Sequence, residues 1–331
     1  MPTIRDVANR ARVSIKTVSR VINDSPMVRE STKERVLKAM KELDYHPNAL
    51  ARSLVTKETR IIGLIIADVT NPYFPELIRG VEDVANDSGY NVFLCNTDEN
   101  PEKELIYIKL LREKQVDGII LSGSRTSCDQ LNPTLTSGIP LVFINRRVKG
   151  NKVGMVMLDN FGTAYTAVEY LVSLGHKNIG YLGGSTLGQS NMERKNGFIQ
   201  AMVDRGLPYH KLIAEGHPGK KGGYNRTLEL LDTNRPLSAI FAYDDMLAIG
   251  AIEACRERSL SVPEDISIIG FDDIDLAAHI APRLTTFSVP KYEMGRVAAN
   301  MLLNMLGKKE FEKEIVYIPK LTIRDSCCQV N

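Results

Sequence analysis

The sequence predicts an α/β protein with two lobes, each built on a doubly wound parallel sheet, and an N-terminal all-α helix-turn-helix head. From residue 61 onward, short apolar runs rich in β-branched residues alternate with amphipathic stretches, which is typical of parallel strands covered by helices on both faces. The first 60 residues carry 13 Lys and Arg against 7 Asp and Glu, and the remainder carries 29 against 33. A basic head on a slightly acidic body indicates either a polyanionic partner for the head or a solvated basic face.

Three short helices are expected in residues 1–46. Thr3 can cap the first, which runs to about Ala11, and Asp6 stands at the capping-box position. Ser14 follows a brief turn and can cap the second helix. Two helices joined by a tight turn and braced by a third form a helix-turn-helix unit.

Ser31 and Glu34 have the S-x-x-E spacing of a capping box, and the third helix is expected to begin there with Ser31 as its cap. Its apolar residues recur at the spacing of one buried stripe: Val36, Leu37, Met40 and Leu43.

The second helix is expected to separate a core face from a contact face. At 100° per residue, one arc of roughly 140° holds Ile15, Lys16, Ser19, Arg20 and Asn23, and the opposite arc holds Val18, Val21 and Ile22. Lys16 or Arg20 suits a guanine in a DNA major groove, and Ile15 suits a thymine methyl group. Short polar side chains would bind phosphates and set the register: Thr3, Ser14, Thr17, Ser19 and Asn23.

Residues 47–60 are predicted to form a hinge helix and linker. Pro47 ends the preceding helix, and Asn48 can cap a helix that ends at Leu54 or Val55. Two helical turns are too few to be stable alone in water, so we expect this helix to form only when something packs against it.

The body is expected to contain two sets of strands. The predicted strand runs are IIGLIIAD, YNVFLC, DGIILSG, PLVFIN, NIGYLGG, KLIAEG, SAIFAYD and ISIIGFDD, and EIVYIPKLTIRD is expected to be a late strand that completes the sheets. The expected N-terminal lobe comprises residues 61–160 and about 290–322, and the C-terminal lobe comprises residues 161–289 and about 323–331.

The sequence matches no template for catalysis, metal binding or a cofactor. The glycines of YLGGSTLGQS miss the spacing of a dinucleotide loop and of a nucleophile elbow, and the five histidines are scattered. The apolar runs are far shorter than a membrane span, charged residues interrupt the N-terminus where a signal peptide would be apolar, and the five cysteines have no metal-type spacing. We therefore expect a reduced, cytoplasmic binding protein rather than an enzyme, with no catalytic residue, metal or cofactor.

Ordered motifs along nearly the whole chain resemble the lactose/galactose repressor (LacI/GalR) family of bacterial transcription regulators. They are TIRDVANRARVSIKTVSRVIND, ESTKERVLKAMKELDYHPNALARSL, GLIIADVTNPYFPELIRGVEDVA, VDGIILSG, GHKNIGYLGG, ERKNGF, VPEDISIIGFDD and PRLTTFSVP. The resemblance implies a homodimer that binds a palindromic operator in double-stranded DNA, with one recognition helix for each half-site. It also implies that Ile15, Lys16 and Arg20 read bases.

For residues 48–54, the resemblance implies a segment that becomes helical only on DNA. Leu54 would wedge into the minor groove and kink the duplex, and Asn48 and Arg52 would contact the DNA backbone.

The body is similar to periplasmic sugar-binding proteins, which implies a small-molecule effector, a sugar or sugar derivative, between the lobes. The family's cleft positions correspond to Tyr73, Phe74, Asn145, Arg146, Phe161, Arg194, Asp244 and Asp272. We expect Asp245 to cap a helix rather than to contact the ligand. Two positions depart from the pattern, because Asn145 replaces a common aspartate and Pro218 stands where some relatives have an aromatic residue.

These observations together predict a dimeric, sequence-specific repressor whose DNA affinity changes with effector binding. A dimer is expected because no heptad tail follows the last predicted strand. One alternative is a regulator that answers to a phosphorylated partner protein, because DENPEKELIYIKLLREKQVDGI resembles catabolite-control regulators. A sugar-binding transport component is a second alternative, but it would carry a signal peptide and no basic head.

Overall fold

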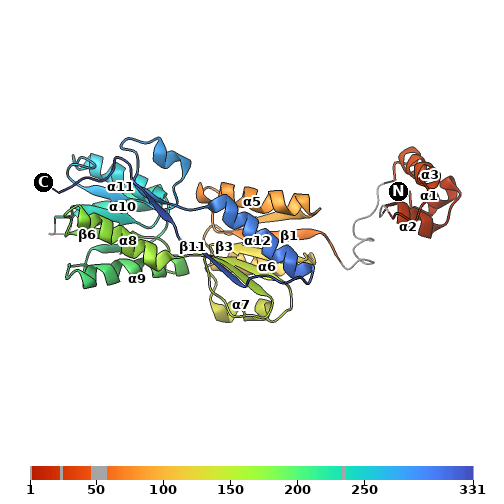
Figure 1. Ribbon diagram of the computed structural model, residues 1–331, viewed down its shortest axis with the longest axis horizontal. Helices are drawn as coiled ribbons and strands as arrows, with labels where there is room; N and C mark the ends of the chain where they lie inside the picture. Colours follow the sequence, from red (N-terminus) through yellow and green to blue (C-terminus); the bar gives the residue numbers. More distant parts are fainter. Residues whose placement is uncertain (1, 23–24, 46–57, 233–235, 331) are drawn as a thin grey trace. The chain divides into compact units, whose positions relative to one another are not determined.

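The computed structural model describes residues 2–22, 25–45, 58–232 and 236–330. The chain divides into two compact units, residues 1–59 and residues 60–331 (Figure 1). Each unit has its own hydrophobic core.

The first unit contains three helices among its described residues: α1 (Ile4–Ala11), α2 (Ile15–Ile22) and α3 (Glu30–Glu42). The predicted caps of α1 and α2 are confirmed. Thr3 N donates to Asp6 Oδ2 over 2.8 Å while Asp6 N donates to Thr3 Oγ1, and Thr17 N donates to Ser14 Oγ over 3.1 Å. The helices enclose a small apolar core: Val7, Ala8, Ala11, Val18, Val21, Val36 and Ala39.

Two expectations for the third helix are wrong. The capping box of Ser31 and Glu34 does not form, because α3 already begins at Glu30 and the amides of the next turn bond to the carbonyl of Arg29. Leu37 is 47% exposed. Ala39 takes the buried place, since it lies nearly one turn from Val36 on the same face.

The first sheet of the body has six parallel strands in the order β11-β5-β4-β3-β1-β2. Their bounds are β1 (Ile61–Ile66), β2 (Asn91–Asn96), β3 (Gly118–Ser122), β4 (Leu141–Ile144), β5 (Val153–Leu158) and β11 (Glu314–Tyr317). Helices α5 (Tyr73–Asp87) and α12 (Lys291–Leu306) pack on one face, and α6 (Pro101–Glu113) and α7 (Cys128–Leu135) pack on the other (Figure 1). The sheet is therefore doubly wound, as predicted.

The second sheet has four parallel strands in the order β7-β6-β8-β9. Their bounds are β6 (Ile179–Gly183), β7 (Ile213–Glu215), β8 (Ala239–Ala242) and β9 (Ser267–Ile269). Helices α8 (Asn160–Ser173) and α9 (Gln189–Asp204) cover one face, and α10 (Lys220–Leu231) and α11 (Asp245–Glu257) cover the other. A short 3-10 helix, η1 (Asp275–Ala278), follows β9.

The predicted late strand is two strands rather than one. Its first part, β11, pairs with β5 of the first sheet, and its second part, β12 (Lys320–Thr322), pairs antiparallel with β10 (Thr286–Ser288). Pro319 separates them, since proline has no amide hydrogen to donate to a neighbouring strand. Within the described residues, every helix is too short or too polar to cross a lipid bilayer.

Helices α5 and α12 approach closely through two glycines. A Cβ at Gly80 would lie 2.1 Å from the carbonyl oxygen of Tyr292, and a Cβ at Gly295 would lie 2.1 Å from that of Leu77. Both obstacles are backbone atoms, so the helices would have to separate to admit a methyl group.

We predict that Gly295→Ala lowers the free energy of unfolding by about 1–3 kcal/mol, because the clash outweighs alanine's better helix propensity. Chemical denaturation measures the change. Gly307→Ala, at the exposed end of α12, is the control, because the nearest atom lies 3.4 Å from its added Cβ. Equal stability of the two variants would contradict the close packing of α5 on α12.

Candidate effector cavity and DNA-binding face

The side chains of α2 divide between core and solvent as predicted. Val18 and Val21 are buried, whereas Ile15 is 43% exposed and Lys16 and Arg20 are exposed. The helix therefore presents two cations and an aliphatic side chain to solvent, with its apolar side packed in the head's core.

The short polar residues of the head differ in their hydrogen bonds and in their exposure to solvent. The Ser14 hydroxyl caps α2 and hydrogen-bonds Thr17 Oγ1 over 2.9 Å. Thr3 is exposed beyond the start of α1, and Thr17 and Ser19 are half-buried. Four predicted DNA contacts lie outside the described residues: Asn23, Asn48, Arg52 and Leu54.

In the body, a cavity of about 50 Å³ is lined from segments that follow strands of both sheets. The carboxyl ends of parallel strands are the usual place for ligands in such folds. Six of the eight predicted effector residues line it: Tyr73, Phe74, Asn145, Arg194, Asp244 and Asp272. Pro218 lines it as well.

The structure places the other two predicted residues elsewhere. Arg146 is buried beside the cavity wall, where its Nη1 donates to Ser124 Oγ over 2.7 Å, so it supports a lining residue without lining the cavity itself. Phe161 is 43% exposed, because α8 turns this side chain away from its buried face.

Arg194 is fixed on several sides. Its Nε donates to Asn160 Oδ1 over 2.9 Å, and its Nη1 donates to the carbonyl oxygen of Tyr243. The guanidinium carbon lies 3.4 Å from the ring centroid of Phe271 and 4.4 Å from that of Tyr243. These contacts hold a planar cation in one orientation, which suits bidentate hydrogen bonding.

Asp244 takes the capping role that was expected of Asp245, and it lines the cavity as well. Asp244 caps α11, since its Oδ1 accepts from Leu247 N over 2.7 Å. The carboxylate of Asp245 instead accepts from Thr286 Oγ1 over 2.5 Å and from Ile274 N over 2.9 Å, so the expectation that Asp245 is the cap is wrong. The chain enters the helix one residue earlier than expected.

The second carboxylate oxygen of Asp244 is buried and has no hydrogen-bond partner. Burial raises the pKa of Asp244 to about 6 and that of Asp245 to about 7. Burial also raises the pKa of Asp272 above its usual range, against the opposing effect of Arg194. The cavity therefore holds acceptors that lack a donor.

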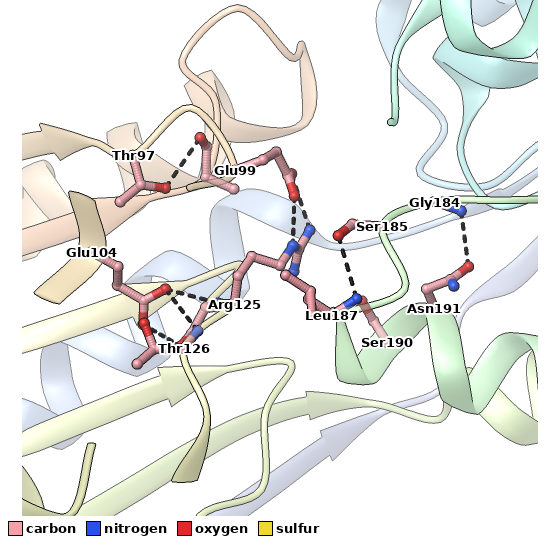
Figure 2. Close-up of polar contacts among 12 residues, drawn as sticks. Thr97, Glu99, Glu104, Arg125, Thr126, Gly184, Ser185, Leu187, Ser190 and Asn191 are labelled. Atoms are coloured by element: carbon pink, nitrogen blue, oxygen red, sulfur yellow. Dashed lines mark hydrogen bonds and ion pairs between the residues drawn. The ribbon is translucent and has the colours of Figure 1, made fainter. Parts of the chain in front are cut away.

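Sequence reasoning missed an ion pair in the cavity wall. Arg125 donates from Nε to Glu99 Oε2 over 2.5 Å and from Nη2 to Glu99 Oε1 over 3.0 Å, and both residues line the cavity. Figure 2 shows Arg125 reaching Glu99 while the buried carboxylate of Glu104 bonds to the loop that carries Arg125. The signal in the sequence was weak, because Glu99 and Arg125 follow the successive predicted strands YNVFLC and DGIILSG, which β1 separates in the sheet.

Two family models match the chain. Residues 3–48 match the bacterial regulatory proteins of the lacI family, and residues 168–327 match the periplasmic binding protein-like domain. The regulator DegA of Bacillus subtilis is 39% identical over 99% of both chains. The chain belongs to the lacI family. It is therefore a DNA-binding transcriptional regulator with an effector-binding domain, in a family whose regulators are not enzymes.

A second relative and a solved structure are also similar to the chain. The ribose operon repressor of Halalkalibacterium halodurans is 39% identical, covering 98% of this chain and 97% of that protein. The lac repressor dimer bound to operator and an anti-inducer superposes with a TM-score of 0.87 over 99% of both chains, at 24% identity. The second likeness supports the fold of the whole chain, including the helical head.

We predict that Asp244→Asn stabilises the protein at pH 8 but much less at pH 5. The folded-state pKa is raised, so the stability that protonated Asp244 contributes is fully present below about 3.8 and is lost as the pH rises through about 6. The variant escapes this loss, and its advantage should grow by about 1–2 kcal/mol between pH 5 and pH 8.

Denaturation at both pH values measures this difference. Asp245 titrates in both proteins, and because the charge of Asp244 helps to raise the pKa of Asp245, removing that charge adds to the variant's advantage at high pH. Asp87→Asn, which removes an exposed carboxylate at the end of α5, controls for the change in net charge. An Asp244→Asn advantage that stays constant with pH would contradict the burial of an ionisable carboxylate at this position.

Proposed function

We propose that the protein is a repressor that binds a palindromic operator as a homodimer and whose DNA affinity is set by a sugar or sugar derivative. The observation that carries the effector part is the cavity, which is lined by segments from both sheets, by a fixed Arg194 and by Asp244, whose Oδ2 has no hydrogen-bond partner among the described residues. The exposed cations of α2 carry the DNA part.

The chemistry of the cavity wall favours a neutral molecule with several hydroxyl groups. Asp244 and Asp272 supply acceptors, and Arg194 supplies donors. The rings of Tyr73 and Phe74 offer apolar surface for the carbon skeleton. An anionic ligand fits less well, since the lining carboxylates outnumber the lining guanidinium groups. The name of the ribose operon repressor among the relatives also supports a sugar.

A second copy of the chain is proposed to pack on the edge of the first sheet. Phe93 and Leu94 lie on β2, the edge strand, and both are exposed large apolar residues. Exposed apolar edges favour association. A two-fold dimer would present two copies of α2, as a palindromic operator requires.

Effector and operator binding are proposed to be coupled through the lobes. A ligand that contacts both lobes favours the arrangement in which those contacts are made, and a shift of that kind alters the linked heads. Coupling of about 1–3 kcal/mol is typical and acts equally in both directions. The alternative regulator that answers to a phosphorylated partner protein stays a prediction from the sequence.

Selection from a library of randomised DNA duplexes tests the DNA part. We predict enrichment of a two-fold symmetric sequence, and we expect Arg20→Ala to weaken binding to it by about 1–3 kcal/mol with relaxed preference at one base in each half-site. Lys38→Ala is the matched control, because it removes the same charge from the outer face of α3. Equal losses for both variants would indicate that Arg20 contributes charge alone, and enrichment of no symmetric sequence would overturn the proposal.

Thermal unfolding with ribose, glucose and cellobiose tests the effector part. We predict that at least one sugar at millimolar concentration raises the melting temperature, because binding stabilises the native state, and that Asp272→Asn reduces this shift. Asp275→Asn removes a carboxylate three residues away whose side chain is 97% exposed, so the shift should persist. A shift of the same size in Asp272→Asn would remove Asp272 from the site.

A further inference from the structure

The segment after β9 has an unusual backbone. Asp272 has a φ of 109° and Asp273 has a φ of 52°, both in the region that favours glycine. Residues with a Cβ hold such angles only where the surroundings enforce them, and they are frequent at functional sites. Asp272 lines the cavity, whereas Asp273 does not.

Lys291 contacts this segment directly. Its ammonium group donates to the carbonyl oxygen of Asp272 over 2.9 Å and to that of Asp273 over 3.0 Å, and it lies 3.4 Å from Glu76 Oε1. These three acceptors match the three protons of an ammonium group. Lys291 is only 3% exposed, so it is a buried cation whose hydration is replaced by these contacts.

The neighbouring residues are held as well. Arg324 Nη2 donates to Asp273 Oδ1 over 2.7 Å, and Ile274 N donates to the buried Asp245. Among the described residues, none donates a hydrogen bond to the carboxylate of Asp272. The backbone of this segment is thus fixed, while the carboxylate of Asp272, the residue of the segment that lines the cavity, has no hydrogen-bond donor in the described part of the chain.

Lys291 connects parts of the body that belong to different sheets. It is the first residue of α12, which packs with α5 on the first sheet, and Glu76 lies on α5. Asp272 follows β9 of the second sheet. The carbonyl group of Asp272 is therefore held by a side chain of the first lobe, while its N–H donates to the carbonyl oxygen of Phe287 over 3.0 Å.

We propose that Lys291 is a positioning residue that enforces the strained backbone of Asp272 and so directs its carboxylate into the effector cavity. Because Lys291 belongs to the first lobe, separation of the lobes withdraws the ammonium group and lets the segment relax. Lobe position then controls whether the acceptor is presented. The role of Asp272 in binding rests on the proposed function, whereas its enforced backbone does not.

A double-mutant cycle on the full chain, without ligand, tests the enforcement. Lys291→Met removes the ammonium group and keeps an unbranched side chain of similar length. Asp272→Gly removes both the backbone strain and the carboxylate, and Asp272→Asn removes the charge but keeps the Cβ. Melting temperatures are measured for each single variant and for both double variants.

We expect Lys291→Met to lower the melting temperature by about 4 °C or more in the wild-type and Asp272→Asn backgrounds, and by less than half as much in Asp272→Gly. Glycine adopts the observed φ without enforcement, so the ammonium group contributes less to the stability of the Asp272→Gly variant. Equal losses in all three backgrounds would show a purely structural contact. Losses reduced equally by Asn and Gly would show charge pairing, and either result overturns the proposal.

If Lys291→Met does not fold, the double variants still test the proposal. Recovery of folding by Asp272→Gly but not by Asp272→Asn supports the proposal, and any other pattern of recovery overturns it. Glu76→Gln, at the exposed partner of Lys291, is the control and should shift the melting temperature little. Since no sugar enters this experiment, its failure leaves the effector proposal standing, and a failed sugar titration leaves the cycle interpretable.

Discussion

Charged groups enclosed in a protein are tolerated only where fixed partners replace the water that they have lost. The arrangement around the cavity follows from this constraint. Arg194 is surrounded by two aromatic rings, an amide oxygen and a backbone carbonyl, and Arg125 by the carboxylate of Glu99. Oδ2 of Asp244 has no hydrogen-bond partner among the described residues, so the constraint is met incompletely at this side chain.

Polar contacts cross between the lobes beside a hydrophobic core cluster that contains buried residues of both. Lys291 contacts the segment after β9, and Arg147, which follows β4 of the first sheet, lies 3.2 Å from Glu193 of α9 in the other lobe. Arg147 also lies 2.8 Å from Glu314 of β11 in its own sheet. Glu193 also accepts from Asn160, which orients Arg194.

Sequence patterns predicted the fold well because the apolar runs have strand length and regular spacing. The patterns were less accurate where a shift of one residue in the start of a helix, or a single tertiary contact, decides the role of a side chain. Asp244 and Asp245 are adjacent acids, and only the point at which the chain becomes helical decides which one caps α11. Ala39 is buried in place of Leu37, and Arg146 hydrogen-bonds a residue of the cavity wall without lining the cavity. Tertiary neighbours decide in both cases which side chains face inward. The ion pair of Arg125 and Glu99 joins two loops, and no local pattern encodes such a pair.

The cavity is small, and its principal polar side chains, Asp244, Asp272 and Arg194, are themselves buried. A volume of about 50 Å³ holds only a few water molecules. A ligand larger than this space would enter and leave it when the lining segments separate. The time that such a ligand stays bound would then depend on two quantities, the rate at which the lining segments separate and the strength of the ligand's hydrogen bonds.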